Sequence, residues 1–249
     1  MERIWITGGG TGIGRELALA YAQRGSRVWI SGRRLEVLQE VANEARGYSG
    51  EVHCAPLDVT DSSACEQVWS TILDESGGVE RVILNAGDHR EMPVEAFSQQ
   101  TMEHLINVNL FGVTRLIEQV LPWMLQQGGQ LAIVASLAGY RGLPLAAAYG
   151  ASKAALINMT EAMRAELEGG PVDLRLINPG FVRTPLTDRN QFEMPSLIDA
   201  DVAAQRIISG LDGKCFEIRF PTMFAATLRL LSMLPYRLYF ALIRKITSK

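Results

Sequence analysis

The sequence predicts a single α/β domain built on a doubly wound parallel sheet, and three observations lead to this prediction. Short apolar segments alternate along the chain with longer segments of helical periodicity. The apolar segments are almost continuously hydrophobic, as strands covered on both faces require. No internal repeat, low-complexity stretch or interdomain linker divides the 249 residues, of which 47% are hydrophobic.

The predicted strands are short and rich in Val, Ile and Leu. They cover residues 3–7, 27–32, 52–59, 81–87, 129–136 and 172–180. Each of the first five precedes a segment whose apolar residues recur every three to four positions, which predicts a helix. These helices cover residues 14–25, 35–45, 64–76, a long stretch that ends near residue 127, and 149–167. Strands that alternate with helices in this way run parallel and are covered on both faces.

A glycine-rich turn joins the first strand to the first helix. In TGGGTGIG (7–14), Gly8, Gly12 and Gly14 have the spacing GxxxGxG. Glycines there permit a tight turn and let a pyrophosphate approach the backbone and the helix N-terminus. The position between a strand and a helix favours a Rossmann-type dinucleotide site over an ordinary glycine-rich turn.

The stretch after the second strand bears on which dinucleotide binds. Gly32 stands where an acid that binds the ribose 2′-hydroxyl is usual, and Arg33 and Arg34 follow it. A guanidinium could meet a 2′-phosphate here, so NADP(H) is favoured over NAD(H). The alternative is that both arginines only begin a solvated helix. Asp58 could accept a hydrogen bond from the adenine amine or cap a helix.

The stretch YGASK (149–153) places Tyr149 and Lys153 one helical turn apart on one face. An ammonium beside a phenol favours the phenolate, which predicts a lowered tyrosine pKa and proton transfer near neutral pH. In isolation, a helix with an exposed Lys and a half-buried Tyr is the commoner source of such a pair. Ser136 upstream and the glycine-rich turn favour the catalytic interpretation.

Together these motifs resemble the short-chain dehydrogenase/reductase family, in the branch whose chains have about this length. The motifs are TGGGTGIG, LNAG, Asn109, Ser136, YGASK and NPGFVRT, in the family's order and spacing over residues 1 to about 212. The sugar-nucleotide epimerases are similar in fold but usually carry a GxxGxxG turn and a longer C-terminal half. Leu84 is a mild departure, because the family often has a second Asn there.

The resemblance implies hydride transfer between a nicotinamide and a carbonyl/alcohol substrate. Tyr149 would exchange a proton with the substrate oxygen, and Lys153 would lower the pKa of the phenol and hold the nicotinamide ribose. Ser136 would hydrogen-bond the substrate oxygen. Asn109 would kink its helix and hold a water that links the lysine to solvent. The implied cofactor-binding residues are Gly8, Thr11, Gly12, Ile13, Gly14, Arg33, Arg34, Asp58, Val59, Asn85, Ala86, Gly87, Tyr149, Lys153, Pro179, Gly180, Val182 and Thr184.

Composition argues against several other classes of protein. A net charge of −3 is unlike that of a nucleic-acid binder, which is usually basic. Cys54, Cys65 and Cys215 are odd in number and widely spaced, which fits free thiols in a reducing compartment. The three histidines lack metal-ligand spacing. The first residues lack the apolar core of a signal peptide, so we expect a cytoplasmic location.

Three segments are expected to cover the substrate, namely residues 88–95, 137–146 and 185–198. Their apolar side chains, which include Leu137, Leu186 and Phe192, favour a hydrophobic ketone, aldehyde or secondary alcohol over a sugar. An alternative for many of these residues is a place in the core or in a subunit contact.

We expect residues 1–213 to form the catalytic domain and residues 214–249 to form an apolar, basic helical extension. The extension carries seven basic residues and one acid, a net charge of +6 that leaves −9 for residues 1–213. The longest charge-free run within 220–249 has nine residues, fewer than the roughly 20 that span a bilayer. Helical spacing relates the apolar residues Tyr239, Leu242, Ile243 and Ile246. Three partners fit this pattern: an anionic membrane surface, another subunit of a homodimer or homotetramer, or the protein's own substrate pocket.

The sequence therefore predicts an NADP(H)-dependent oxidoreductase that acts on a hydrophobic carbonyl/alcohol pair. The alternative is a non-catalytic dinucleotide-binding scaffold or redox sensor, which could also be peripheral to a membrane. Competent residues at all four catalytic positions tell against that alternative.

Overall fold

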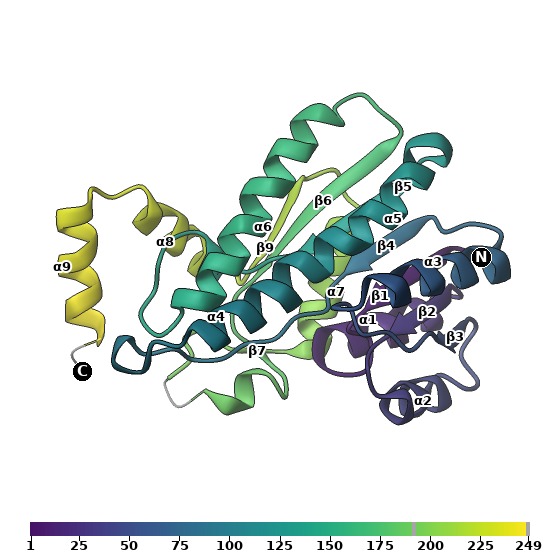
Figure 1. The fold of residues 1–249 in the computed structure, drawn as a ribbon, viewed down its shortest axis with the longest axis horizontal. Coiled ribbons are helices and arrows are strands. Elements are labelled where there is room, and N and C mark those ends of the chain that lie inside the picture. Colours follow the sequence, from purple (N-terminus) through teal and green to yellow (C-terminus); the bar gives the residue numbers. More distant parts are fainter. Residues whose placement is uncertain (191–192, 248–249) are drawn as a thin grey trace.

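The computed structural model describes residues 1–190 and 193–247, and a seven-stranded parallel sheet forms its centre (Figure 1). The strand order is β3-β2-β1-β4-β5-β6-β9. The strands are β1 (Arg3–Thr7), β2 (Arg27–Ser31), β3 (Glu51–Cys54), β4 (Arg81–Leu84), β5 (Gly129–Val134), β6 (Val172–Pro179) and β9 (Glu217–Phe220). The order reverses between β1 and β4, which is where sheets of this kind bind ligands. The predicted doubly wound fold is confirmed.

Helices cover both faces of the sheet. One face packs against α1 (Gly12–Gln23), α2 (Leu35–Glu44) and α7 (Ala200–Leu211). The other face packs against α3 (Ser62–Ser76), α5 (Gly112–Gln127) and α6 (Ala147–Glu166). A short helix, α4 (Gln99–Ile106), packs on α6. Two short strands, β7 (Val182–Arg183) and β8 (Ile198–Asp199), form a separate pair.

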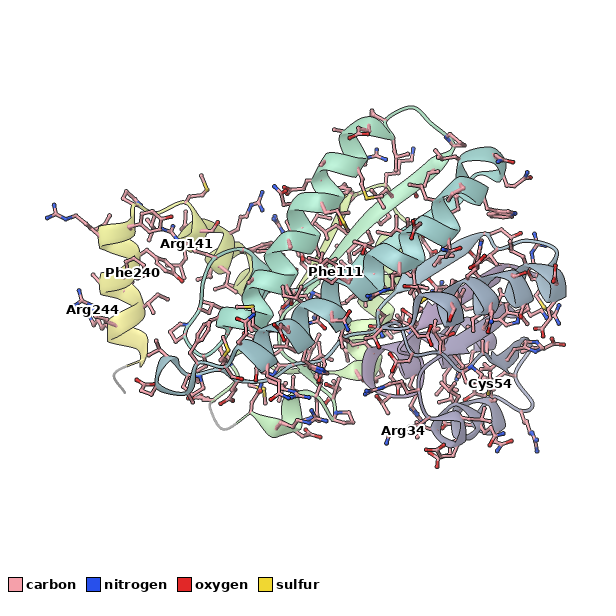
Figure 2. The ribbon with its side chains drawn as sticks, viewed as in Figure 1. Arg34, Cys54, Phe111, Arg141, Phe240 and Arg244 are labelled. Carbon is pink, nitrogen blue, oxygen red and sulfur yellow. The ribbon has the colours of Figure 1, made fainter. Side chains whose placement is uncertain are left out.

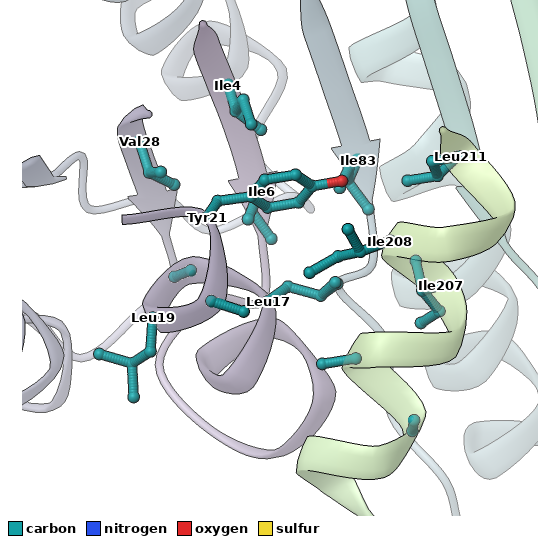
Figure 3. Close-up of a cluster of buried hydrophobic side chains, with 14 of the residues drawn as sticks. Ile4, Ile6, Leu17, Leu19, Tyr21, Val28, Ile83, Ile207, Ile208 and Leu211 are labelled. Carbon is teal, nitrogen blue, oxygen red and sulfur yellow. The ribbon is translucent and has the colours of Figure 1, made fainter. Parts of the chain in front are cut away.

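The two faces divide the core because side chains alternate along each strand. Ile4 and Ile6 of β1 meet α1 and α7 in one cluster, while Trp5 between them stacks on Trp69 of α3, with 5.6 Å between ring centroids. Figure 3 shows the first cluster, where Tyr21 lies across the strands. Each large aliphatic side chain buried in this way stabilises the fold by about 1.5–3 kcal/mol.

The sheet extends further along the chain than the sequence predicted. Residues Glu217–Phe220 fall within 214–249, the stretch that we expected to be helical, but they form the edge strand β9 beside β6. The segment EIRF alternates charged and apolar residues, as an edge strand can, and lacks the continuous apolar run that identified the other strands. The helical part therefore begins with α8 (Thr222–Ser232) and continues with α9 (Tyr236–Thr247), at the left of Figure 1. No helix in the described ranges is long and apolar enough to cross a membrane.

Candidate active site

The turn between β1 and α1 is so tightly packed that three positions require glycine. Gly8 and Gly12 have positive φ angles of 67° and 54°. A Cβ atom on Gly14 would lie 2.2 Å from the Gly8 carbonyl oxygen, and one on Gly12 would lie 2.8 Å from Cγ2 of Thr184. The turn is consequently a cradle that exposes backbone at its glycines, where a ligand can approach closely.

The N-terminus of α1 offers unsatisfied positive potential at this cradle. The residue before the helix, Thr11, makes no side-chain capping hydrogen bond, and the first turn contains no acid. The first amides of a helix have no partner within it, and its dipole is positive at this end. The cradle can therefore bind a phosphate group.

Thr7 and Asn85 fix the two strand ends that border the switch point. The Thr7 hydroxyl accepts hydrogen bonds from the backbone amides of Asn85 and Ala86, each at 3.1 Å. In return, Nδ2 of Asn85 donates to the carbonyl oxygens of Thr7 at 3.1 Å and Gly8 at 3.2 Å. Asn85 thus holds the glycine turn against β4. Thr7 opens the motif TGGGTGIG, but it was not among the predicted cofactor-binding residues.

A cleft of about 310 Å³ opens over these strand ends. It brings together most of the predicted cofactor residues. Those that line it are Gly8, Thr11, Gly12, Ile13, Arg33, Arg34, Asp58, Val59, Asn85, Ala86, Gly87 and Thr184. Other predicted residues lie just outside the lining: Gly14 packs beneath the turn, and the Pro179 carbonyl oxygen lies 3.4 Å from Oγ of Ser136. The Gly180 amide donates to the Phe220 carbonyl oxygen at 2.7 Å, and Val182 is buried.

The end of the cleft next to α2 is positively charged. Arg33 and Arg34 are exposed, and neither forms an ion pair with a carboxylate in the described part of the chain; Arg34 is labelled in Figure 2. A Cβ atom on Gly32 would meet only Cδ2 of Leu38, at 3.5 Å, so a side chain would fit at this position. Asp58 uses Oδ1 to accept hydrogen bonds from the Thr60 amide at 2.9 Å and hydroxyl at 2.7 Å.

The catalytic candidates meet where a short 3-10 turn, Leu137–Gly139, packs against α6. A Cβ atom on Gly139 would lie 2.7 Å from Cδ1 of Ile157 and 2.8 Å from the backbone carbon of Lys153, so glycine permits this approach. The turn begins at Ser136, whose Oγ accepts a hydrogen bond from the Ala138 amide at 3.1 Å. Ser136 is also close enough to Tyr149 to act on the pKa of its phenol.

Burial controls the protonation of Tyr149. The ring packs among Met92, Met102 and Leu105, and this desolvation raises the pKa of Tyr149 above its usual value, although the hydrogen bond with Ser136 acts in the opposite direction. The sequence predicted a lowered pKa. The direction differs because the apolar neighbours come from α4 and the loop before it, which the motif does not reveal.

Lys153 is buried beside this tyrosine. Its ammonium donates a hydrogen bond to the Val134 carbonyl oxygen at 3.0 Å and lies 5.8 Å from the centroid of the Tyr149 ring. Desolvation lowers the pKa of Lys153 to about 8. A Cβ atom on Gly87 would lie only 3.6 Å from Nζ of Lys153. The lysine ammonium therefore lies next to Gly87, which lines the cleft.

Asn109 lies in a π-helical turn, Asn107–Phe111, between α4 and α5. Its side chain is fully buried, and both its oxygen and its nitrogen form hydrogen bonds with the protein. Oδ1 accepts from the Asp88 amide at 2.7 Å, and Nδ2 donates to the Asp88 carbonyl oxygen and to the Ser152 hydroxyl, each at 3.0 Å. In this geometry Asn109 ties the loop after β4 to α6, next to Lys153.

Charged and aromatic contacts that the motifs did not predict surround the loop after β4. His89 meets the Tyr149 ring edge-on, with 4.7 Å between centroids, and burial lowers the pKa of this histidine. Asp88 accepts a hydrogen bond from Nε2 of His104 at 2.8 Å and lies 3.5 Å from the Arg189 guanidinium. These partners are far apart in the sequence, so spacing carried no signal of the contacts.

The three segments predicted to cover the substrate do converge. The Met92 amide donates to the Leu145 carbonyl oxygen at 2.8 Å, and this hydrogen bond connects segment 88–95 with segment 137–146. The ion pair between Arg189 and Asp88 connects segment 185–198 with segment 88–95. Leu137 is buried and Leu186 lines the cleft. Phe192 lies outside the described residues. Within those residues, no group of three or more His, Cys, Asp or Glu side chains is arranged to hold a metal ion.

Sequence comparison finds oxidoreductases along nearly the whole chain. The family described as short chain dehydrogenase matches residues 2–194. An uncharacterized oxidoreductase of Myxococcus xanthus is 36% identical over 242 residues, which cover 97% of this chain and 96% of that protein. The 3-oxoacyl-[acyl-carrier-protein] reductase FabG of Thermotoga maritima is 32% identical and matches 89% of each chain.

Solved structures with bound dinucleotides have the same fold. A short-chain dehydrogenase/reductase from Burkholderia phymatum in complex with NAD has a TM-score of 0.84 and 25% identity, over 92% of each chain. A short-chain dehydrogenase from Burkholderia cenocepacia in complex with NADP has a TM-score of 0.83 and 27% identity, over 97% of this chain and 99% of that one. The similar proteins therefore include binders of each dinucleotide.

Proposed function

The chain belongs to the short-chain dehydrogenase family, and we propose that it is an NADP(H)-dependent oxidoreductase that interconverts a hydrophobic ketone or aldehyde and its alcohol. A bound nicotinamide supplies or accepts the hydride. The single observation that carries the proposal is the position of the buried Lys153, whose ammonium lies 5.8 Å from the centroid of the Tyr149 ring, next to the glycine-lined cleft.

The fit of a dinucleotide rests on the cradle and its charges. Glycine at positions 8, 12 and 14 permits the tight turn, because a Cβ atom at each would collide with neighbouring protein atoms, and the N-terminus of α1 would hold the pyrophosphate. The guanidinium groups of Arg33 and Arg34 would bind the 2′-phosphate of NADP(H), and Gly32 has no carboxylate that would repel it. These three residues are the basis for proposing NADP(H) in place of NAD(H).

Tyr149 would give its phenolic proton to the carbonyl oxygen as the carbonyl carbon receives the hydride, so that ketone, hydride and proton together yield the alcohol. A raised pKa keeps the phenol protonated at neutral pH, which suits a donor. Ser136 would hydrogen-bond the same oxygen and orient it. Lys153, whose pKa is about 8, would stabilise the phenolate and return a proton to it.

A substrate with an apolar body is supported by the lining residues and by one relative. Met92 and Leu137 are buried within the segments that converge on the site, and Leu186 lines the cleft. The relative named as a 3-oxoacyl reductase supports a carbonyl substrate on an aliphatic chain. A cytoplasmic location and a homodimer or homotetramer complete the proposal, and both are carried over from the sequence expectations.

The second candidate function is a non-catalytic dinucleotide-binding scaffold or redox sensor. A panel of hydrophobic and polar ketones, aldehydes and alcohols, assayed with NADPH and with NADH by nicotinamide absorbance, separates the two. We expect turnover of hydrophobic carbonyls with NADPH at a kcat/KM at least about tenfold above that with NADH. Tight NADPH binding without turnover of any compound would favour the scaffold instead.

A further inference from the structure

One arginine contacts both α8 and α9, in addition to the packing of α8 on the domain through the buried Ala225. Nη1 of Arg141 donates to the carbonyl oxygens of Leu231, Ser232 and Leu234, at 3.2, 2.8 and 2.6 Å. Its guanidinium lies 4.1 Å from the centroid of the Tyr239 ring. The Tyr239 hydroxyl donates to the Gly142 carbonyl oxygen, and Tyr239 is the one residue of α9 that is buried among residues 236–245.

The rest of this region exposes apolar side chains to solvent. We call the following six residues the apolar surface. They are Leu230, Met233, Tyr236, Leu238, Phe240 and Leu242, and between 41% and 76% of each is exposed. Phe240 is labelled on α9 in Figure 2, at the end of the molecule opposite α2. Clustered exposed apolar residues of this kind mark a surface that binds something.

Basic residues accompany the apolar surface, and acids do not. Arg229, Arg237, Arg244 and Lys245 lie on the same two helices, while the sequence after Glu217 contains no Asp or Glu. None of these four cations pairs with a carboxylate in the part of the chain that the structure describes. The side chain of Ile246, also predicted on the apolar face, lies outside the described residues.

We infer that α8 and α9 dock the protein on the surface of an anionic lipid bilayer. An amphipathic helix with an apolar face and flanking Lys or Arg lies in the plane of the interface, with its apolar side chains among the lipid chains and its cations at the anionic headgroups. The 12 residues of α9 match this arrangement in length and in the separation of the two kinds of side chain. This inference does not depend on the proposed reaction.

The charges favour lipid over the two other partners that the sequence left open. A two-fold contact between copies through this patch would bring two sets of four cations together, and the patch contains no carboxylate to offset them. Part of this region does pack on the protein's own domain, because Leu228, Leu231 and Tyr239 line a small cavity with Leu137, Tyr140 and Leu143. The six residues of the apolar surface remain exposed, so that contact leaves them free for another partner. An anionic bilayer complements both the apolar side chains and the charge.

Flotation of the full-length protein with vesicles tests the inference. One set of vesicles is pure phosphatidylcholine and the other contains phosphatidylserine as well. The variants are the double substitution Leu238→Glu/Phe240→Glu for apolar insertion and Arg244→Gln/Lys245→Gln for charge. Matched controls on α7 are Val202→Glu and Arg206→Gln, both of exposed residues.

We expect binding to the phosphatidylserine vesicles only, and it should weaken as salt is added. Each cation near the surface strengthens partitioning about fivefold, so Arg244→Gln/Lys245→Gln should bind about 25-fold more weakly. Leu238→Glu/Phe240→Glu should not float, while the α7 controls should float like the wild type. Circular dichroism of each variant verifies its fold.

Two results would overturn the inference. The first is an absence of binding to the anionic vesicles by the wild type, or equal binding by all variants. The second is sedimentation velocity that shows the wild type as an oligomer and Leu238→Glu/Phe240→Glu as a monomer, since the apolar surface would then belong to a contact between copies.

Discussion

The ammonium of Lys153 lies 5.8 Å from the centroid of the Tyr149 ring, one turn further along the same helix. Burial affects both groups and favours the neutral form of each, because it raises the pKa of Tyr149 and lowers the pKa of Lys153 to about 8. In the proposed reaction the neutral phenol would give its proton to the substrate oxygen, and Lys153 would return one to it.

We predict that Lys153 makes the unfolding free energy rise between about pH 8 and pH 10. Below pH 8 the folded and unfolded states both hold its proton, so the group adds no pH dependence. Above pH 8 the folded protein releases the proton while the unfolded chain keeps it, which stabilises the folded state by up to about 2–3 kcal/mol. Urea unfolding of the wild type and of Lys153→Met measures the difference. A difference that stays constant with pH would mean that the lysine is not desolvated.

The residues at the end of the cleft next to α2, Gly32 and Arg33, are predicted to determine the preference for NADPH over NADH. Arg33→Ala should weaken NADPH binding about 10- to 100-fold and leave NADH almost unchanged, because a charge-assisted hydrogen bond is lost. Gly32→Asp, for which there is room, should reverse the preference. Titration of both dinucleotides gives the dissociation constants, with exposed Arg46→Ala as the control. Equal losses for both dinucleotides would remove the role assigned to Arg33.

Ser136 is expected to act through its hydroxyl. Ser136→Ala removes the partner of Tyr149 and should lower kcat about 100-fold with little change in the dissociation constant of NADPH. Ser136→Thr keeps a hydroxyl and should retain more of the rate. Steady-state kinetics measures both variants, and wild-type kinetics in Ser136→Ala would exclude the role. Because Oγ of Ser136 also accepts a hydrogen bond from the Ala138 amide at 3.1 Å, thermal unfolding should accompany the assay.

Arg141 should control the local stability of α9. Arg141→Ala removes three hydrogen bonds and the ring contacts with Tyr236 and Tyr239, a local loss of about 2 kcal/mol. Amide hydrogen exchange within residues 236–247 should accelerate about 30-fold, while exchange in the sheet stays as in the wild type. Arg206→Ala on α7 serves as the control. Unchanged exchange in α9 would show that other contacts hold the helix.

Local features of the chain were predictable from the sequence, whereas contacts between distant segments were not. The glycine turn could be predicted because Gly8, Gly12 and Gly14 lie close together in the sequence, and their spacing is typical of this backbone geometry. The pKa direction of Tyr149 could not, because it depends on Met92 and Leu105, which the fold brings to the ring. Strand β9 was missed because EIRF alternates charged and apolar residues and lacks the continuous apolar run of the other strands.

The C-terminal region illustrates the same limit. Its amphipathic pattern predicted helices, and α8 and α9 are present. The inference of a membrane contact depends on the exposed fractions of Leu238 and Phe240 and on the contact of Tyr239 with Gly142, none of which a sequence pattern contains. The contact of Asp88 with Arg189 likewise joins two loops that only the folded chain brings together.

Substitution of Tyr149 tests the central claim most directly. In single-turnover oxidation of NADPH by a hydrophobic ketone, Tyr149→Phe should be about 10²- to 10⁴-fold slower than the wild type, with its NADPH dissociation constant nearly unchanged. Tyr48→Phe, a half-buried tyrosine away from the cleft, should react like the wild type. Wild-type rates in Tyr149→Phe would contradict the assignment of this phenol as the proton donor.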